Sequence, residues 1–313
     1  MKRPIAVVQG SLNCDITACG QRLPKLGETV IGTNSSMSSG GKGANQAVQL
    51  AKMGAEVYMI GRVGKDSYGD FLISQLKAAG VKTDYVLQED ESTGLGVVHC
   101  DSNGQYYAMV IPNANGSCCA ADVMAAKDVI AEADVMMCQL ESTDDAMYCA
   151  AKMAKEFSVP LILNPAPAKQ VDPSLFACAH TITPNETETA FYTKMNAEEL
   201  VTKEKWTIAA NRLLDMGAKR ALITLGGNGS FYLEQGREIY VPAFSVNAVD
   251  TTAAGDAFNG AYAYAVATSL PLEESLMLAT AAGALATQNV GAQASMRGLI
   301  DIKNFLKEHY HES

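Results

Sequence analysis

The 313-residue sequence has few of the residues that build zinc sites, and none of them in the spacing that such sites need. It contains four histidines and eight cysteines, and no two cysteines form a CxxC pair. Structural zinc sites require tighter clusters of these residues. We therefore expect no zinc site and interpret the cysteines as free thiols, most of them small core residues. They are Cys14, Cys19, Cys100, Cys118, Cys119, Cys138, Cys149 and Cys178.

Positive charge and long apolar runs are also scarce. The 34 acidic residues outnumber the 24 lysines and arginines, so the formal net charge is -10, whereas nucleic acids and anionic membranes are bound by basic surfaces. No stretch reaches the roughly 18 consecutive apolar residues of a membrane span. Only four apolar residues follow Pro4 before Gln9, too few for a secretion signal. We expect a cytoplasmic protein without a nucleic-acid or membrane partner; an anionic small-molecule substrate remains compatible with these numbers.

What the sequence does contain is an alternation of apolar strands with helices. Strand-like segments lie at residues 5–10, 56–64, 133–141, 160–165, 180–185 and 220–227. Helical segments lie at residues 43–54, 68–80, 144–157, 185–193, 206–218, 253–269, 272–288 and 300–309. Strands that are apolar along their length and alternate with helices are typical of a parallel sheet covered on both faces. The sequence thus predicts an α/β fold.

Two segments interrupt this alternation. Residues 15–34 and 93–112 have the pattern of β ribbons, the second with a turn at residues 101–104. They are either surface hairpins or a small sheet that covers a site as a lid. No linker, repeat or low-complexity stretch divides the chain. We therefore expect one domain of residues 1–313, with a lid formed by about 15–34 and 93–112.

The stretch VDTTAAGDAFNG at residues 249–260 has two carboxylates around a run of small residues and leads into a helix. The first turn of a helix has unpaired backbone N–H groups and the positive end of the helix dipole, both of which attract anions. The small residues leave these amides accessible. Asp256 then lies in the first turn, beside the bound anion. A plain N-cap is the simpler alternative, since aspartate is common there.

Six further polar motifs follow predicted strands or begin predicted helices. They are GSLNCD (10–15), SSGGKGANQA (38–47), QLES (139–142), NPAPA (164–168), TPNETE (183–188) and TLGGNG (224–229). Each alone is compatible with an ordinary turn, and TLGGNG suits the approach of a phosphate or nucleotide and equally a hairpin into the following SFYLE. SSGGKGANQA is not a Walker A loop, which needs Ser or Thr after GxxxxGK. Together the motifs occupy successive strand ends of one sheet, the edge where α/β proteins bind ligands, which favours a site for a polyol and a phosphate.

With these motifs in this order and spacing, the chain resembles the ribokinase-like carbohydrate kinases over nearly its whole length. GGKGANQA and DTTAAGDAFNG are the two most specific matches. The resemblance implies a central, mostly parallel sheet flanked by helices on both faces, with a small β-sheet lid. It also implies ATP-dependent phosphorylation of the O5 hydroxyl of D-ribose, with Mg²⁺ and an activating monovalent cation, usually K⁺, and a homodimer formed through the lid sheet.

The resemblance also implies roles for particular residues. Asp256 matches the catalytic base, and Ala253, Ala254 and Gly255 match the anion hole for the transferred phosphoryl group. The sugar-binding positions, besides Asp256, are Asn13, Asp15, Gly41, Lys42, Gly43, Asn45 and Glu141. The nucleotide-binding positions are Asn185, Glu188, Thr224, Gly226, Gly229, Gly255 and Thr280. Asn185 and Glu188 match a motif linked to phosphate and Mg²⁺, and the K⁺ positions, many of which act through backbone carbonyls, are Asp250, Thr252, Ala286, Asn289, Gly291 and Ser295.

The chain departs from the commoner members of this family at three places. These are the lid segment MVIPNANGSCC (109–119), Thr280 where a histidine is frequent, and Thr252 where an aliphatic residue is more usual. Because lid residues cover the sugar, a kinase of deoxyribose, a ketohexose or a nucleoside is an alternative. A second alternative is a non-catalytic sugar-binding regulator, against which the intact Asp256 argues. A dinucleotide-dependent oxidoreductase would need GxGxxG after the first strand, which here ends in GSLNCD.

Overall fold

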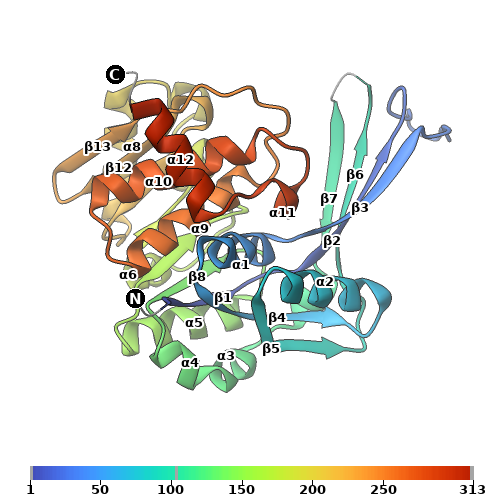
Figure 1. Cartoon of the computed structure of the whole chain (residues 1–313), viewed down its shortest axis with the longest axis horizontal. Helices are drawn as coiled ribbons and strands as arrows, with labels where there is room; N and C mark the ends of the chain where they lie inside the picture. The colour runs from blue at the N-terminus through green and yellow to red at the C-terminus, as the bar shows by residue number, and fades with distance from the viewer. Residues whose placement is uncertain (1–2, 103–104, 311–313) are drawn as a thin grey trace.

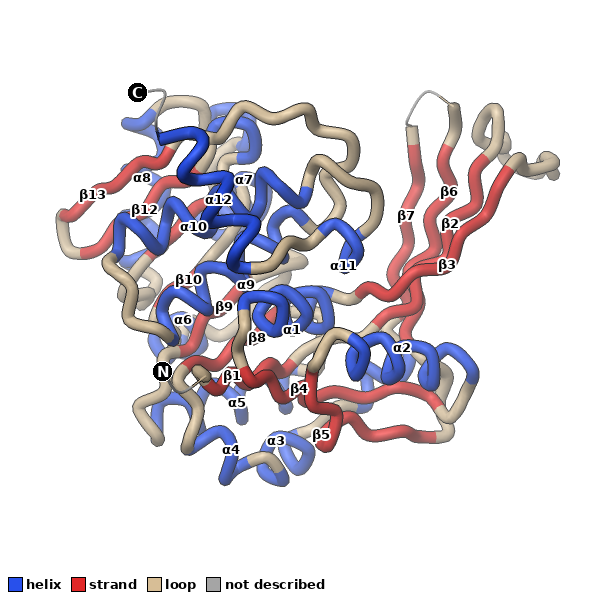
Figure 2. Tube along the Cα trace, viewed as in Figure 1, coloured by secondary structure: helices blue, strands red, loops and turns tan. Residues whose placement is uncertain are grey.

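A computed structural model describes residues 3–102 and 105–310. A large sheet lies between two layers of helices, and a smaller sheet projects from one side of this body (Figures 1 and 2). The predicted α/β fold with a mostly parallel sheet and a small accessory sheet is confirmed. None of the described helices is long and apolar enough to cross a membrane.

The large sheet has nine strands in the order β13-β12-β11-β10-β9-β8-β1-β4-β5. Seven pair in parallel: β1 (Ile5–Gln9), β4 (Glu56–Gly64), β5 (Val81–Glu89), β8 (Val135–Gln139), β9 (Leu161–Asn164), β10 (Thr181–Ile182) and β11 (Ala221–Thr224). β12 (Ser230–Glu234) and β13 (Arg237–Val241) continue the sheet as antiparallel strands. The motif TLGGNG therefore forms a hairpin into SFYLE, as expected for one of its two interpretations.

The smaller sheet has four strands in the order β3-β2-β6-β7. They are β2 (Asn13–Cys19), β3 (Asn34–Gly40), β6 (Gly94–Cys100) and β7 (Tyr106–Ile111). The second predicted ribbon matches β6 and β7, although part of its turn lies outside the described residues. The boundaries of the first were wrong, because the return strand begins where the predicted ribbon ended and residues 20–33 form the connecting loop. The reason is that β3, NSSMSSG, has a single apolar residue and no alternation.

Helices cover both faces of the large sheet. One face carries α1 (Lys42–Met53), α2 (Ser67–Ala78), α9 (Ala254–Ala267), α10 (Leu272–Ala286) and α12 (Leu299–Tyr310). The other carries α3 (Ala120–Ala125), α4 (Lys127–Ala131), α5 (Asp144–Glu156), α6 (Ser174–Cys178), α7 (Glu186–Thr193) and α8 (Lys203–Asp215). The short α11 (Ala292–Ser295) contacts β3, and 3₁₀ turns lie at η1 (Asn113–Ser117), η2 (Ala197–Glu199) and η3 (Gly226–Asn228).

The core explains why the strands read as apolar along their length. In β1, Val7 packs with the helices of one face while Ala6 and Val8 pack with those of the other, and all three are fully buried. Alternate residues of a strand point to opposite faces, so a strand with helices on both sides needs apolar residues at every position. The polar residues that end these strands, such as Gln9 and Gln139, are equally buried and call for hydrogen-bond partners.

One expectation about the cysteines was wrong. Cys19 and Cys100 are paired residues of β2 and β6 and form a disulfide. The other six cysteines are free thiols, as expected. Because the two residues are 81 positions apart, only the register of the two strands brings them together.

Candidate active site

Asp256 lies in the first turn of α9 and is almost fully buried, with 7% of its surface exposed. Asn45 Nδ2 and Gln46 Nε2 donate hydrogen bonds to its two carboxylate oxygens, each at 2.9 Å. Both donors come from the start of α1, so the glycine-rich motif and the aspartate motif meet at this point. Burial raises the pKa of Asp256, while the charge of Lys42 and the two amide hydrogen bonds act in the opposite direction.

The N-terminus of α9 opens onto a cavity of about 190 Å³ that also borders Asp256 and Lys42. Ala253, the residue before the helix, has a left-handed φ of 58°, and no side chain caps the helix. The N–H of Ala254 donates to Thr251 O at 3.2 Å. Gly255 lines the cavity, and nothing lies within 4 Å of the position that a Cβ would take there. A helix start with open space beside its first amides is the geometry of an anion site.

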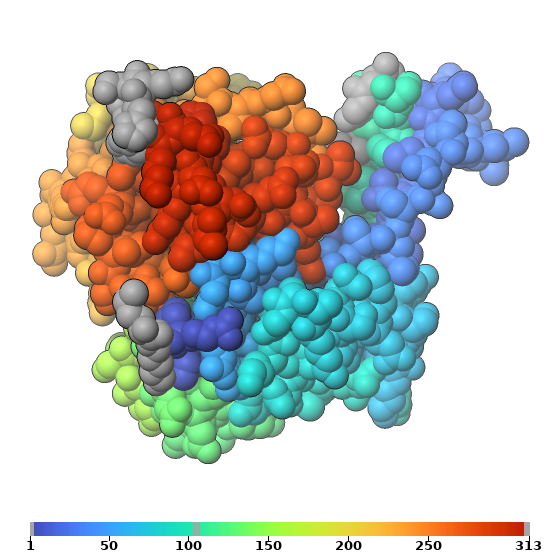
Figure 3. Space-filling model, in the orientation of Figure 1, coloured from blue at the N-terminus to red at the C-terminus, as the bar shows by residue number. Residues whose placement is uncertain are grey.

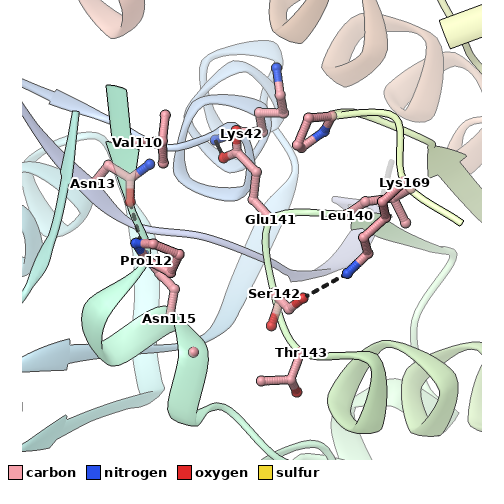
Figure 4. A pocket seen from close by; sticks show the side chains of 12 residues that line it. Asn13, Lys42, Val110, Pro112, Asn115, Leu140, Glu141, Ser142, Thr143 and Lys169 are labelled. Atoms are coloured by element: carbon pink, nitrogen blue, oxygen red, sulfur yellow. Dashed lines mark hydrogen bonds between the residues drawn. The ribbon is translucent and has the colours of Figure 1, made fainter. Parts of the chain in front are cut away.

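Figure 4 shows the residues that line a second cavity, of about 600 Å³. Lys42 lines both cavities, so the two adjoin at this residue. Glu141 links two segments of the cavity wall. Its Oε2 accepts hydrogen bonds from Ser11 Oγ at 2.6 Å and from the N–H of Lys42 at 3.1 Å. Burial alone would lower the pKa of Lys42, but the carboxylates of Asp256, Glu141 and Glu188 outweigh it and raise that pKa. The lining residues are Asn13, Lys42, Val110, Pro112, Asn115, Gly116, Leu140, Glu141, Ser142, Thr143, Pro167 and Lys169.

Gly41 and Gly43 bring the start of α1 against the end of β1. Gly41 has a φ of 89°, and a Cβ there would lie 2.7 Å from Ser11 O. A Cβ at Gly43 would lie 2.7 Å from the carbonyl carbon of Gly10. Any larger residue would push the helix away, so the two glycines set the distance between Lys42, Glu141 and the strand end.

Asp15 lies on β2 in the same cross-strand row as Val110, which lines the second cavity, and its carboxylate occupies a space that two glycines leave free. A Cβ at Gly40 or Gly96 would lie 1.9 or 2.2 Å from its carboxylate oxygens. Within residues 3–102 and 105–310, no side chain or backbone group donates a hydrogen bond to this carboxylate. Burial, and then the negative charges of Glu141 and Asp256, raise the pKa of Asp15 to about 6. Hydroxyl groups of a polyol are the donors that such a carboxylate lacks.

Several residues that the sequence did not reveal hold these groups in place. Asn115, in η1, accepts from the N–H of Leu12 at 2.9 Å and donates to Leu12 O at 3.1 Å and to Asn13 Oδ1 at 2.8 Å. Because Asn13 Oδ1 already accepts a hydrogen bond, the Asn13 amide presents its NH₂ group as the donor to a ligand. From the sequence, the segment NANGSCC (113–119) stands out only as a departure from the family.

Buried amides form a further layer beneath Asp256. Gln139 Nε2 donates to Gln46 Oε1 at 2.7 Å, and Gln46 Nε2 also donates to Asn164 Oδ1 at 3.2 Å. Gln139 and Asn164 are the last residues of β8 and β9. A glutamine at the end of an otherwise apolar strand was the signal that could have found this layer.

Asn185 and Glu188 cap each other at the start of α7. Asn185 Oδ1 accepts from the N–H of Glu188 at 2.9 Å, and the Glu188 carboxylate accepts from the Asn185 N–H at 2.9 Å and from Asn185 Nδ2 at 3.1 Å. This capping box lies on the wall of the cavity that Asp256 and Thr224 line. Burial raises the pKa of Glu188, against the Asn185 hydrogen bond and the charge of Lys42.

The remaining predicted nucleotide positions lie in the β11–β12 hairpin and on α10. Gly226 begins the 3₁₀ turn η3. Gly229 is the close-packed end of this turn, since a Cβ there would lie 2.1 Å from Val241 O. Thr280 is buried, with its hydroxyl donating to Leu276 O at 2.8 Å and 3.2 Å from Ser230 Oγ. Gly229 and Thr280 are therefore held by packing and hydrogen bonds within the protein.

Asp250 joins the two loops that carry the predicted K⁺ positions. Its Oδ1 accepts from the N–H of Thr252 at 2.9 Å and its Oδ2 from the N–H of Gly291 at 2.8 Å. Burial alone would raise the pKa of Asp250, but these N–H groups lower it. In α11, Ser295 Oγ donates to Ala292 O at 2.8 Å, and just after α10 the N–H of Asn289 is 3.5 Å from Ala286 O.

Carboxylate and backbone carbonyl oxygens, the groups present in this region, are the kind of donor that hard cations prefer. By contrast, the part of the chain that the structure describes holds no group of three or more His, Cys, Asp or Glu residues that could bind a metal by themselves.

A buried carboxylate and an open helix start, with a larger cavity beside them, are the arrangement that a small-molecule phosphotransferase needs. The family comparison gives the particular class: residues 5–298 match the pfkB family of carbohydrate kinases. The chain belongs to this family.

Similarity to individual members covers almost the whole chain. A ribokinase of Bacillus subtilis (strain 168) is 35% identical over 305 residues, which are 97% of this chain and 99% of that protein. A deoxyribokinase of Salmonella typhi is 32% identical over 96% of this chain and 98% of its own length. The structure of Arabidopsis thaliana ribokinase complexed with ribose and ATP superimposes with a TM-score of 0.90 and 34% identity, covering 98% of this chain and 99% of that one.

Proposed function

We propose that this carbohydrate kinase transfers the γ-phosphoryl group of ATP to the O5 hydroxyl of D-ribose. One observation carries the proposal: Lys42 lines both cavities, and Asp256 stands at the one into which α9 opens. A sugar in the larger cavity and a phosphoryl group at the helix start would therefore meet beside a buried carboxylate. The similarity to ribokinases supports ribose as the sugar.

The chemistry of the proposal follows from the residues at this junction. Asp15 and Glu141 accept hydrogen bonds from sugar hydroxyls and Asn13 donates one. Asp256 accepts the proton of the attacking hydroxyl, which for a positioned base contributes about 10²–10⁴-fold in rate. The amides at the start of α9 and the charge of Lys42 stabilise the negative charge of the transferred group. Bound with ATP, Mg²⁺ would neutralise phosphate charge, with Glu188 and Asn185 at its side of the cavity.

The loops joined by Asp250 would hold the activating K⁺ ion. We propose that the ion acts indirectly, by ordering these loops, because the first of them leads directly into the Ala253–Gly255 turn. An ordered loop fixes the helix start and with it the anion-binding amides. The residues that would supply oxygens are Asp250, Thr252, Ala286, Asn289, Gly291 and Ser295.

We also propose that the four-stranded sheet is both a lid and a dimer interface. It stands away from the main body (Figure 3), and Val110 of β7 reaches the larger cavity. The register places Ile16, Met37, Val97 and Met109 side by side across the four strands, on the face opposite to Asp15. Met37 and Met109 are 50% and 66% exposed. A second copy of the sheet would cover this apolar row.

Sedimentation velocity tests the dimer. We expect the wild-type protein to sediment as a dimer and Met109→Asp as a monomer, with Tyr240→Asp, at an exposed position of the large sheet, as the control that stays dimeric. A wild-type protein that is monomeric at working concentrations would refute the interface. ATP consumption also leads us to propose a cytoplasmic location, which cell fractionation would test.

A substrate panel tests the proposed reaction. ADP release is measured with ATP, Mg²⁺ and K⁺ on ribose, 2-deoxyribose, fructose and adenosine. We expect the highest kcat/KM on ribose. A higher value on another sugar would keep the kinase but move its specificity, and the similarity to a deoxyribokinase makes 2-deoxyribose the first competitor. No activity on any of the four would favour a sugar-binding regulator.

A further inference from the structure

A chain of buried polar side chains runs from the small sheet to Asp256. Ser39 Oγ, on β3, donates to Gln293 Oε1 at 2.7 Å, and Gln293 Nε2 donates to Asn45 Oδ1 at 3.2 Å. Asn45 Nδ2 then donates to Asp256 Oδ2 at 2.9 Å. All four residues are at most 9% exposed, so water does not replace these partners easily.

The polarity of this chain follows from the chemistry of its last member. An ionised carboxylate accepts hydrogen bonds but cannot donate them, so Asn45 must turn its NH₂ group toward Asp256. Its carbonyl oxygen then needs a donor on the opposite side. The NH₂ group of Gln293 is that donor. The Gln293 amide keeps this orientation because its oxygen accepts a hydrogen bond from the Ser39 hydroxyl.

We propose that Gln293 is a positioning residue, which fixes the Asn45 amide with its NH₂ group toward Asp256 and links that orientation to Ser39 on β3 of the small sheet. Its backbone is anchored as well, because Lys52 Nζ donates to Gln293 O at 2.7 Å. The catalytic meaning of this inference rests on the proposed function, in which Asp256 is the base. The orientation of Asn45 by Gln293 does not depend on the proposed function.

Without Gln293, Asn45 is free to turn its oxygen toward Asp256, and an oxygen facing a carboxyl group favours the protonated acid. The other hydrogen bond to Asp256, from Gln46, is held by Gln139 and stays in place. The charged and titratable groups around Asp256 are Lys42, Asp15, Glu141 and Glu188, and none of them changes. At the Asp256 carboxylate, the loss is therefore confined to the one hydrogen bond from Asn45.

The test compares Gln293→Met with Gln49→Met, a control on α1. Gln49 is also buried and also donates one hydrogen bond, to Arg297 O at 2.9 Å, but it has no link to Asp256. For Gln293→Met we expect kcat to fall about 10-fold with a smaller change in ribose KM. We expect the acid limb of the pH–kcat profile to move up by roughly one pH unit, the effect of losing one hydrogen bond to a charged group. Ser39→Ala should shift the limb in the same direction by less.

A second readout needs no activity. In protein labelled with ¹³C at the aspartate carboxyl carbons, the Asp256 signal is identified by its absence in Asp256→Asn. We expect it to titrate at higher pH in Gln293→Met than in the wild type and in Gln49→Met. An unchanged Asp256 titration in Gln293→Met, together with a loss of Tm like that of the control, would overturn the inference. If the titration moves but no sugar is phosphorylated, the positioning role stands and the proposed function fails.

Discussion

Replacing Asp15 by asparagine should make the ligand-free protein more stable and the sugar complex weaker. The Asp15 carboxylate is largely buried, faces the negative charges of Glu141 and Asp256, and has a pKa raised from 3.8 to about 6. That difference corresponds to about 3 kcal/mol of folding free energy at neutral pH. An uncharged amide avoids most of this cost, so we expect Asp15→Asn to raise Tm by up to roughly 4 °C for a chain of this length.

The effect of the Asp15 carboxyl group on stability depends on pH, and its direction follows from the two pKa values. Because the folded pKa lies above the unfolded one, the carboxyl group does not reduce stability below about pH 4, where it is protonated in both states. Between about pH 4 and pH 6 the unfolded chain loses the proton while the folded protein keeps it, so stability is lost as pH rises. The Tm difference between Asp15→Asn and wild type should therefore grow over this range and stay constant above about pH 6.

The assay is differential scanning fluorimetry from pH 4 to pH 8, with and without ribose. Asp84→Asn, at an exposed position of β5, is the control and should show no such pH-dependent gain. Ribose should stabilise the wild type more than Asp15→Asn, whose ribose KM should rise about 10- to 100-fold through the loss of charge-assisted hydrogen bonds. An Asp15→Asn protein with wild-type Tm at every pH would refute the assignment of Asp15 as an unpaired buried carboxylate.

Two further predictions concern the residues around the reaction. Asp250→Ala should abolish most of the activation by K⁺, because Asp250 joins the two loops through the N–H groups of Thr252 and Gly291; a titration of activity with KCl measures it, and an unchanged KCl dependence would contradict the cation site. Asn115→Leu should raise ribose KM about 10-fold with little change in kcat, since it frees the Asn13 amide to rotate; steady-state kinetics measures both, and an unaltered KM would show that Asn13 needs no such support.

The parts of the site that were predictable from the sequence depend on local chemistry. A run of small residues before a helix, followed by Asp256, reflects how helix starts bind anions, and the structure places that aspartate in the first turn of α9. The same holds for Lys42 and Asn45 at the start of α1. Apolar strands that alternate with helices were enough for the order of layers, because burial on both faces demands that pattern.

The parts that were missed depend on the tertiary structure. β5 (Val81–Glu89) was overlooked because it is an edge strand with many polar residues. The hydrogen bonds of Gln293 and Asn115 join residues more than 100 positions apart, and no local pattern marks such pairs. The Cys19–Cys100 disulfide follows from strand register alone.

Product analysis of the wild-type protein and Asp256→Asn tests the central claim most directly. Each protein is incubated with ribose, ATP, Mg²⁺ and K⁺. The ADP formed is quantified, and ³¹P NMR identifies the oxygen that has been phosphorylated. The account predicts one ribose 5-phosphate for each ADP in the wild type, and a rate at least 10²-fold lower in Asp256→Asn with ribose binding by calorimetry retained. A phosphate on another oxygen, or near-normal turnover in Asp256→Asn, would contradict it.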